Sequence, residues 1–121
     1  MQQNQAPQNQ ASIIRQAIAF DELEPLESLE NPVVQDIRIE DMNIAAAIQS
    51  FKVFDWLLNA RGVNESEAIF LLAEHTDDIA IADEIFTRLI GKAPLSPNSI
   101  SLASDMRENE VANYLKAKFG M

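Results

Sequence analysis

The chain of 121 residues has no cysteine, one histidine and three glycines. The absence of cysteine excludes disulfides, thiolate metal sites and a cysteine nucleophile. A single histidine leaves too few imidazoles for a His-rich metal cage or for most acid–base relays. Gly62, Gly91 and Gly120 lie too far apart to form a phosphate-binding loop. The composition therefore argues against the common metalloenzymes and nucleotide-binding proteins, and it predicts no cofactor.

Basic residues are also scarce, with nine Lys and Arg against nineteen Asp and Glu and a net charge of −10. This charge disfavours binding to nucleic acid or to an anionic membrane and favours a basic or neutral partner. The first ten residues, MQQNQAPQNQ, have neither the positive charge nor the apolar core of a secretory signal peptide. The apolar stretch at 42–51 is too short to cross a bilayer. These features predict a cytoplasmic protein, with secretion by a route that needs no signal peptide left open.

The chain length fits one domain, and a hydrophobic content of 47% is enough for a modest core. Residues 1–11 are mostly Gln and Asn and carry no charge. Such a segment buries too little apolar surface to offset its ordering entropy, so we expect a disordered tail. The folded domain is expected over residues 12–121.

From residue 12 onward, the apolar residues follow a helical period of three to four. The stretch 43–64 predicts two helices that break at Gln49–Ser50, with Gly62 just past the second one. Ser50 and Ser66 are predicted to cap the helices that follow them. Residues 33–39 predict an extended loop or a hairpin arm. The sequence as a whole predicts an all-α fold of about eight short helices.

The predicted helix pairs repeat along the chain. Each first helix contains a small or apolar residue at a similar place, which is Ala17, Ala45, Ala73 or its neighbour Leu72, and Ala103. Each second helix contains a leucine, and these are Leu29, Leu57, Leu89 and Leu115. Because the leucines recur at intervals of about 29 residues, the pattern predicts four stacked helix–turn–helix units.

These units resemble degenerate ankyrin repeats. Residues 40–46, EDMNIAA, stand where the family's unit opens, and Val53–Phe54 and Leu57–Leu58 stand at its paired valines and leucines. Residues 61–64, RGVN, resemble its closing turn. No unit opens with Thr-Pro, and the family's Gly-His turn is replaced by Gln49–Ser50 and by its counterparts at 21–22 and 107–108. The resemblance implies stacked antiparallel helix pairs, and an irregular helix bundle is the alternative.

Acidic residues gather in two segments, with eight acids and one base at 21–41 and seven acids and no base at 65–84. A run of charge is usually a solvated face. Two such runs in loops of adjacent repeats could also form one acidic surface that steers a basic partner toward the protein. The candidate partner-binding acids are Glu27, Glu30, Asp77, Asp78, Asp83 and Glu84.

Trp56 and Tyr114 each come one residue before the repeat leucine of their unit. That flank of a stacked helix pair can be partly exposed, where an aromatic side chain anchors a partner. The alternative is that both side chains pack between repeats. His75 lies among acidic residues, and a solvated loop explains that cluster better than a metal site, because no second histidine or EF-hand pattern accompanies it.

The sequence therefore predicts a non-catalytic protein–protein interaction module with an acidic surface. Small acidic proteins of this kind include inhibitors that mask a partner enzyme, such as antagonists of bacterial toxins or effectors. One alternative is a structural protein that assembles with itself as a homodimer. The other alternative is a small enzyme, which the absence of a nucleophile elbow or a metal motif disfavours.

Overall fold

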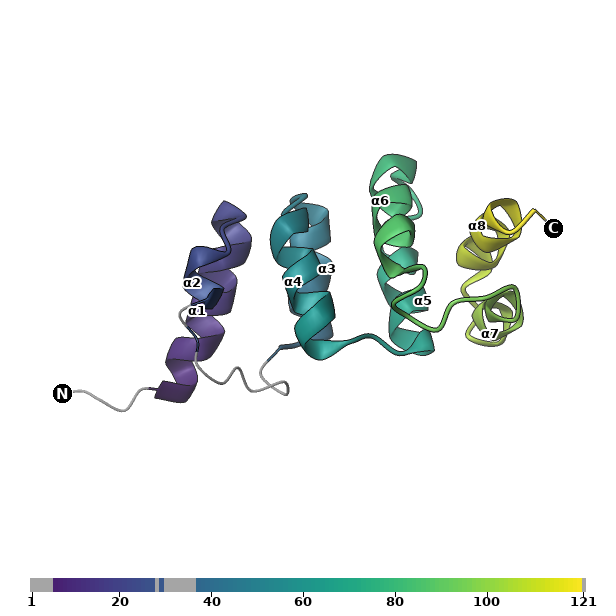
Figure 1. Ribbon diagram of the computed structural model, residues 1–121. Helices are drawn as coiled ribbons and strands as arrows, with labels where there is room; N and C mark the ends of the chain where they lie inside the picture. Colours follow the sequence, from purple (N-terminus) through teal and green to yellow (C-terminus); the bar gives the residue numbers. More distant parts are fainter. Residues whose placement is uncertain (1–5, 28, 30–36, 121) are drawn as a thin grey trace. The chain divides into compact units, whose positions relative to one another are not determined.

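The computed structural model describes residues 6–27, 29 and 37–120, and within these residues it contains helices and no strand. In chain order the helices of this part of the chain are α1 (Ala6–Phe20), α2 (Glu24–Glu27), α3 (Ile39–Ala47), α4 (Phe51–Arg61), α5 (Glu65–Ala73), α6 (Ile79–Leu89), α7 (Ser99–Asp105) and α8 (Asn109–Lys118). The predicted all-α fold of short helices is thus confirmed for the described residues (Figure 1).

The chain divides into two compact units, Met1–Arg61 and Gly62–Met121, where length alone predicts one domain. In the first unit, α1 packs against α2 and α3 packs against α4, and α1 also contacts α3 and α4. In the second unit, α7 packs against α8, and α5 contacts α6, α7 and α8. Each unit therefore builds its own core from helices that pack against their neighbours (Figure 1).

The pairing of α3 with α4 follows from the sizes of their side chains. Ala45 and Ala46 are fully buried on α3, whereas α4 buries the larger Phe54 and Leu57. Small residues on one helix let the bulky face of its neighbour approach closely. The predicted break at Gln49–Ser50 lies between the two helices, while α3 begins at Ile39, earlier than the sequence pattern indicates.

The N-terminal helix also begins early. We expect a disordered tail over residues 1–11, but α1 begins at Ala6, while residues 1–5 lie outside the described residues. Ala and Gln have high helix propensity, and Pro7 falls in the first turn, where its missing N–H removes no helical hydrogen bond. The helical period predicted from residue 12 onward is confirmed in α1, where Ile14, Ala17 and Ile18 lie on one face and are buried.

Three helices end with the same backbone geometry. The backbone turns to a positive φ of 50° at Asp21 after α1, 64° at Gln49 after α3 and 64° at Arg107 after α7. The next amide then donates to the carbonyl oxygen five residues earlier, and in each case that carbonyl belongs to a buried alanine. The three alanines are Ala17, Ala45 and Ala103. This is the Schellman closure of a helix C-terminus. Helix α5 differs, since no residue in the described turn at 74–78 has a positive φ.

The predicted cap at Ser66 is wrong, and Ser50 has a partner outside α4. The Ser50 hydroxyl donates to the carbonyl oxygen of Ile18 at the end of α1, and the Val53 amide, three residues after Ser50, donates to Asp21 Oδ1 at 3.2 Å. Helix α5 is capped by Asn64, whose Oδ1 accepts from the Glu67 amide at 2.8 Å, while Glu67 Oε1 accepts from the Asn64 amide at 3.2 Å. Asn64 caps the helix in place of Ser66 because Glu67 lies three residues after Asn64, which is the spacing of a capping box. Ser66 consequently lies inside the first turn of α5.

The segment at 33–39, predicted to be extended, lies largely outside the described residues, and its last residue, Ile39, is the first residue of α3. Ile37, just before that helix, is buried, and its carbonyl oxygen accepts from Arg61 Nε at 2.7 Å. The last turn of α4 is therefore tied to the residues that precede α3.

Candidate functional site

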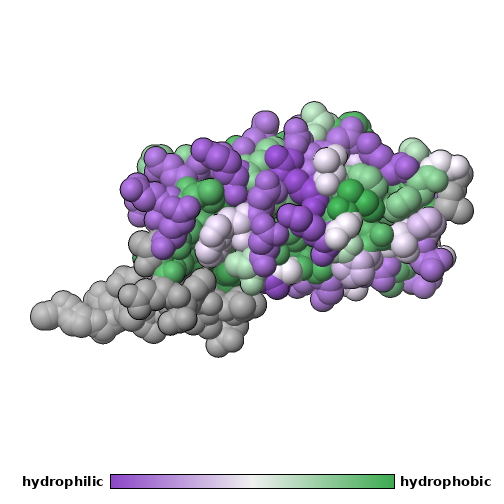
Figure 2. Space-filling view, in the orientation of Figure 1, coloured by the Kyte–Doolittle hydropathy of each residue, from purple (hydrophilic) through white to green (hydrophobic). Residues whose placement is uncertain are grey.

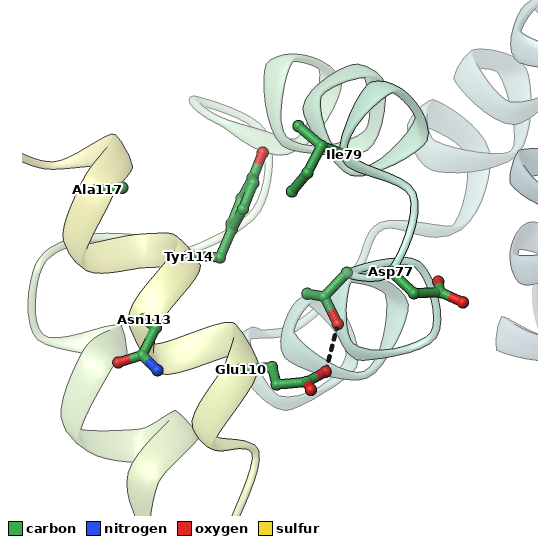
Figure 3. A pocket seen from close by; sticks show the side chains of 7 residues that line it. Asp77, Ile79, Glu110, Asn113, Tyr114 and Ala117 are labelled. Atoms are coloured by element: carbon green, nitrogen blue, oxygen red, sulfur yellow. Dashed lines mark hydrogen bonds between the residues drawn. The ribbon is translucent and has the colours of Figure 1, made fainter.

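An open groove of about 410 Å³ lies in the second unit, between α8 and the turn that leads into α6 (Figure 3). It is lined by Thr76, Asp77, Ile79, Glu110, Asn113, Tyr114 and Ala117. Ligand sites in proteins commonly have volumes of about 300–1,000 Å³. We call this feature the α6–α8 groove.

Local sequence places the walls of the groove. Asp78 is the N-cap of α6, and its Oδ1 accepts from the Ile81 amide at 3.4 Å. This cap makes Ile79 the first residue of α6, where its side chain is 56% exposed. On α8, Glu110, Tyr114 and Ala117 are spaced by four and three residues, so they share one face of the helix. That face forms the opposite wall.

One end of the groove is acidic. Glu110 Oε1 accepts a hydrogen bond from the Thr76 hydroxyl at 3.2 Å, which connects the first turn of α8 to the turn after α5 (Figure 3). Asp77 lies at the rim beside Thr76, and its carboxylate turns outward from the groove in Figure 3. Asp77 and Glu110 are both exposed. This end of the groove therefore presents two exposed carboxylate groups and no basic side chain.

The other end of the groove is electrically balanced. The Tyr114 hydroxyl donates to Asp83 Oδ1 at 2.6 Å, and Lys118 Nζ lies 2.8 Å from the same oxygen. The Lys118 ammonium also lies 5.5 Å from the centre of the Tyr114 ring and 5.7 Å from that of Phe86. Phe86 meets Tyr114 edge to face at 6.0 Å. These contacts hold the Tyr114 ring in place as a wall of the groove.

The same contacts shift two pKa values. The hydrogen bond from Lys118, followed by the one from Tyr114, lowers the pKa of Asp83 below its usual 3.8. Burial, followed by the hydrogen bond to Asp83, raises the pKa of Tyr114 well above its usual 10.0. Asp83 is therefore a carboxylate and Tyr114 a neutral phenol at neutral pH, so neither is poised for proton transfer there.

The candidate acids of α6 and its preceding turn have separate roles in the structure. Asp78 caps α6, Asp83 binds Tyr114 and Lys118, and Glu84 pairs with Arg88 one turn later. Asp77 is the one among these four that lines the groove. The structure thus brings Asp77 and Tyr114 together and ties the other three into the fold.

The remaining candidates belong to the first unit. Trp56 is half-buried on α4, and Glu27 is exposed at the end of α2. Glu30 lies outside the described residues. Trp56 therefore keeps part of its ring accessible, as an anchor residue requires, although part of it also packs within the protein.

The first unit has a smaller groove of its own, about 190 Å³, between α1 and α3. Its lining residues are Arg15, Ile18, Ala19, Asp41, Ile44 and Ile48. Ile44 and Ile48 are about half exposed, and Phe20 at the end of α1 is 67% exposed. Apolar side chains are thus left open to solvent among the hydrophilic ones, as the space-filling view also shows (Figure 2). We call Ile44 and Ile48, which both line this groove, the apolar patch of the first unit.

Sequence reasoning did not identify most residues of the α6–α8 groove. Ile79, Glu110, Asn113 and Ala117 were not among the candidates, and neither was Thr76. A signal for part of the set was present, because Glu110 and Ala117 flank Tyr114 at helical spacing on a helix that the sequence does predict. The turn residues had no such signal, since a contact across 34 residues depends on the tertiary fold.

His75 is buried in the turn between α5 and α6, so the predicted solvated loop is wrong for this side chain, although the neighbouring Asp77 and Asp78 are exposed. Across the described residues, no three or more His, Asp or Glu side chains gather in a way that could hold a metal ion. None of the helices in this part of the chain is long and apolar enough to cross a membrane.

The chain was also compared with protein-family models, with curated proteins and with solved structures, and no match was found in any of the three comparisons.

Proposed function

We propose that this protein is a non-catalytic interaction module that binds another protein through a basic patch on that partner. The observation that carries the proposal is the α6–α8 groove, where the exposed Ile79 and the ring of Tyr114 stand beside two exposed carboxylates. Apolar walls with a few polar groups are typical of recognition sites. A groove of this composition suits a basic segment of a partner protein.

The proposal includes an ankyrin-like stacking of helix pairs. It is supported by the helix closures that Asp21, Gln49 and Arg107 share. Asp21 and Gln49 are 28 residues apart, or about one repeat length of 29, and Gln49 and Arg107 are 58 residues apart, or two repeat lengths. Gln49, Asp21 and Arg107 also stand where the ankyrin unit has the glycine of its Gly-His turn. A positive φ is the conformation that favours glycine at such a position. Stacked repeats present extended surfaces for protein partners.

The net charge of −10 supports long-range attraction of a basic partner. Exposed acids of this kind mainly raise the association rate, whereas buried apolar anchors determine most of the affinity. Where the partner's basic patch borders an active site, docking of this module blocks access to it. This is the inhibitor role that we propose for a small acidic binder.

The proposal is tested with a photo-crosslinking amino acid at position 79, in the groove, and at position 87, an exposed site farther along α6. A partner captured at position 79 and not at 87 is then purified, and its association rate is measured with the wild type and with Asp77→Lys/Glu110→Lys. We expect the double reversal to slow association about tenfold or more at low salt, and to flatten its salt dependence. An unchanged rate at low ionic strength would contradict the proposal.

A homodimer remains the second candidate because of the apolar patch of the first unit. Exposed apolar residues next to a groove mark an interaction surface, and a second copy of the chain could cover it. Light scattering on the wild type and on Ile44→Glu/Ile48→Glu distinguishes the two functions. A wild-type dimer that the double variant converts to a monomer would favour self-assembly.

A further inference from the structure

We propose that the α6–α8 groove receives one long basic side chain, lysine or arginine, from the partner protein. The inference rests on the proposed function and narrows it, because it names the chemistry that the partner inserts. It is argued from three properties of the groove, which are its apolar walls, its polarised charge and the fixed orientation of Tyr114.

The walls fit the aliphatic stem of such a side chain. Ile79 on α6 faces the ring of Tyr114 on α8, and Ala117 lies beyond that ring, one turn farther along α8 (Figure 3). Lysine and arginine bury three or four methylene groups against apolar surface while keeping the charged head in a polar environment. Tyr114 is largely buried, with 9% of the residue exposed, and its hydroxyl is bonded to Asp83, so the small part that borders the groove is apolar ring.

The charges along the groove favour one orientation of the occupant. The seven lining residues include two carboxylates, Asp77 and Glu110, and no Lys or Arg. At the opposite end, Lys118 lies against Asp83 and above the Tyr114 ring. A cationic head group is therefore attracted toward Glu110, because the Lys118 charge at the other end is already neutralised by Asp83. An acidic side chain would be repelled by the carboxylates of Asp77 and Glu110.

Glu110 can accept the head group without losing its internal contact. Its carboxylate has about four lone-pair sites, and the hydrogen bond from the Thr76 hydroxyl uses one of them. The contact with Thr76 also restricts the Glu110 side chain, so less conformational entropy is lost when a ligand binds. A purely apolar occupant would instead take the Glu110 carboxylate out of water without a new partner. A second copy of this chain would bring ten more net negative charges toward the site.

The experiment uses the full-length protein and three short peptides, acetyl-Ala-X-Ala-amide with X as lysine, norleucine or glutamate. Norleucine keeps the aliphatic stem of lysine and lacks its charge. Binding is followed by NMR through the methyl resonance of Ile79 and the amides of Glu110 and Tyr114. We expect saturable shifts of these resonances with the lysine peptide, at least about threefold weaker binding of the norleucine peptide, and no binding of the glutamate peptide.

The variant Asp77→Asn/Glu110→Gln removes both charges while leaving oxygen acceptors in place. We expect it to weaken binding of the lysine peptide by about three- to tenfold and not to weaken binding of the norleucine peptide. The matched control, Glu22→Gln/Asp105→Asn, removes the same net charge from two exposed carboxylates that do not line the groove. Its affinity for the lysine peptide is expected to equal that of the wild type.

Two results would overturn the inference. Equal binding of the lysine and norleucine peptides would make the groove a purely apolar site. Equal losses in the double variant and in its matched control would mean that the lysine peptide responds to net charge alone. Either result leaves the crosslinking test of the proposed function standing, since a partner could still dock at position 79 without inserting a basic side chain.

Discussion

Tyr114 and Asp83 are joined by a hydrogen bond of 2.6 Å, although 31 residues separate them in the chain. The bond links α8 to α6. Lys118, on the next turn of α8, forms an ion pair with the same carboxylate oxygen of Asp83. One carboxylate thus receives a phenol and an ammonium, and the aromatic rings of Phe86 and Tyr114 lie beneath that ammonium. The contact between the two helices is consequently both polar and apolar at the same point.

Tyr114→Phe is expected to lower the free energy of unfolding by about 1 kcal/mol, because it removes the hydrogen bond and keeps the ring. The measurement is urea denaturation of the full-length protein. Asp83→Asn and the double variant complete a mutant cycle that isolates the coupling between the two side chains. A coupling energy of zero would mean that the bond contributes nothing to stability in solution.

The Tyr114 hydroxyl also predicts a loss of stability in alkaline solution. Burial and then the Asp83 carboxylate raise its pKa in the folded protein, so the unfolded chain loses this proton first as the pH rises past 10.0. A raised pKa contributes stability below the unfolded value and loses it above that value. We expect the stability difference between the wild type and Tyr114→Phe to shrink above about pH 10. A constant difference from pH 8 to 11 would contradict the prediction.

The contribution of Asp83 to the free energy of unfolding is expected to be lost in acid and not in alkaline solution. Lys118 and then Tyr114 lower its pKa in the folded protein below 3.8, so its contribution is present above that pH and is lost as the pH falls through the folded pKa. The stability difference between the wild type and Asp83→Asn should be constant from pH 7 to 5 and should decrease below about pH 4. A stability difference that does not decrease below about pH 4 would contradict the prediction.

The left-handed residues at the helix ends predict stabilising substitutions. Gln49→Gly and Arg107→Gly should each raise the free energy of unfolding by about 0.5–1 kcal/mol, since glycine adopts a positive φ without the Cβ strain. Asp21→Gly is the contrasting variant. It should give no gain, because Asp21 Oδ1 accepts from the Val53 amide at 3.2 Å and this bond would be lost. Thermal denaturation of the three variants measures the difference.

The packing of α3 against α4 predicts two losses of stability. Leu57→Ala should cost about 2–5 kcal/mol by leaving a cavity at a fully buried site. Ala46→Leu should cost about 1–3 kcal/mol, because a larger side chain does not fit a fully buried alanine at a close helix contact. Both costs are measured by urea denaturation, and two neutral substitutions would contradict this helix pairing.

The periodicity of apolar residues was sufficient to predict the helices, the break after α3 and the end of α4 before Gly62. Those features depend on neighbours within one or two turns. The cap of α5 was misassigned because two polar residues competed for it, and the choice of Asn64 depended on Glu67.

The site was predicted only in part, since its residues meet through tertiary contacts. Tyr114 and Asp77 were named from composition and position, but their meeting in one groove was not predicted. The acidic segment at 65–84 looked uniform in sequence. The structure separates it into a cap at Asp78, an ion pair at Glu84 and a helix-to-helix contact at Asp83, because each carboxylate finds a different donor.

The start of α4 has a consequence for how the first unit folds. The Ser50 hydroxyl and the Val53 amide both find their acceptors on the segment that ends α1, at the Ile18 carbonyl and the Asp21 carboxylate. The first turn of α4 therefore relies on α1 for partners that most helices find next to them in sequence. A fragment that begins at Ile37 would lack those acceptors, so its α4 should fray at Phe51–Phe54. The folding of α4 is thus coupled to that of α1 by two hydrogen-bond donors, the Ser50 hydroxyl and the Val53 amide, as well as by apolar packing.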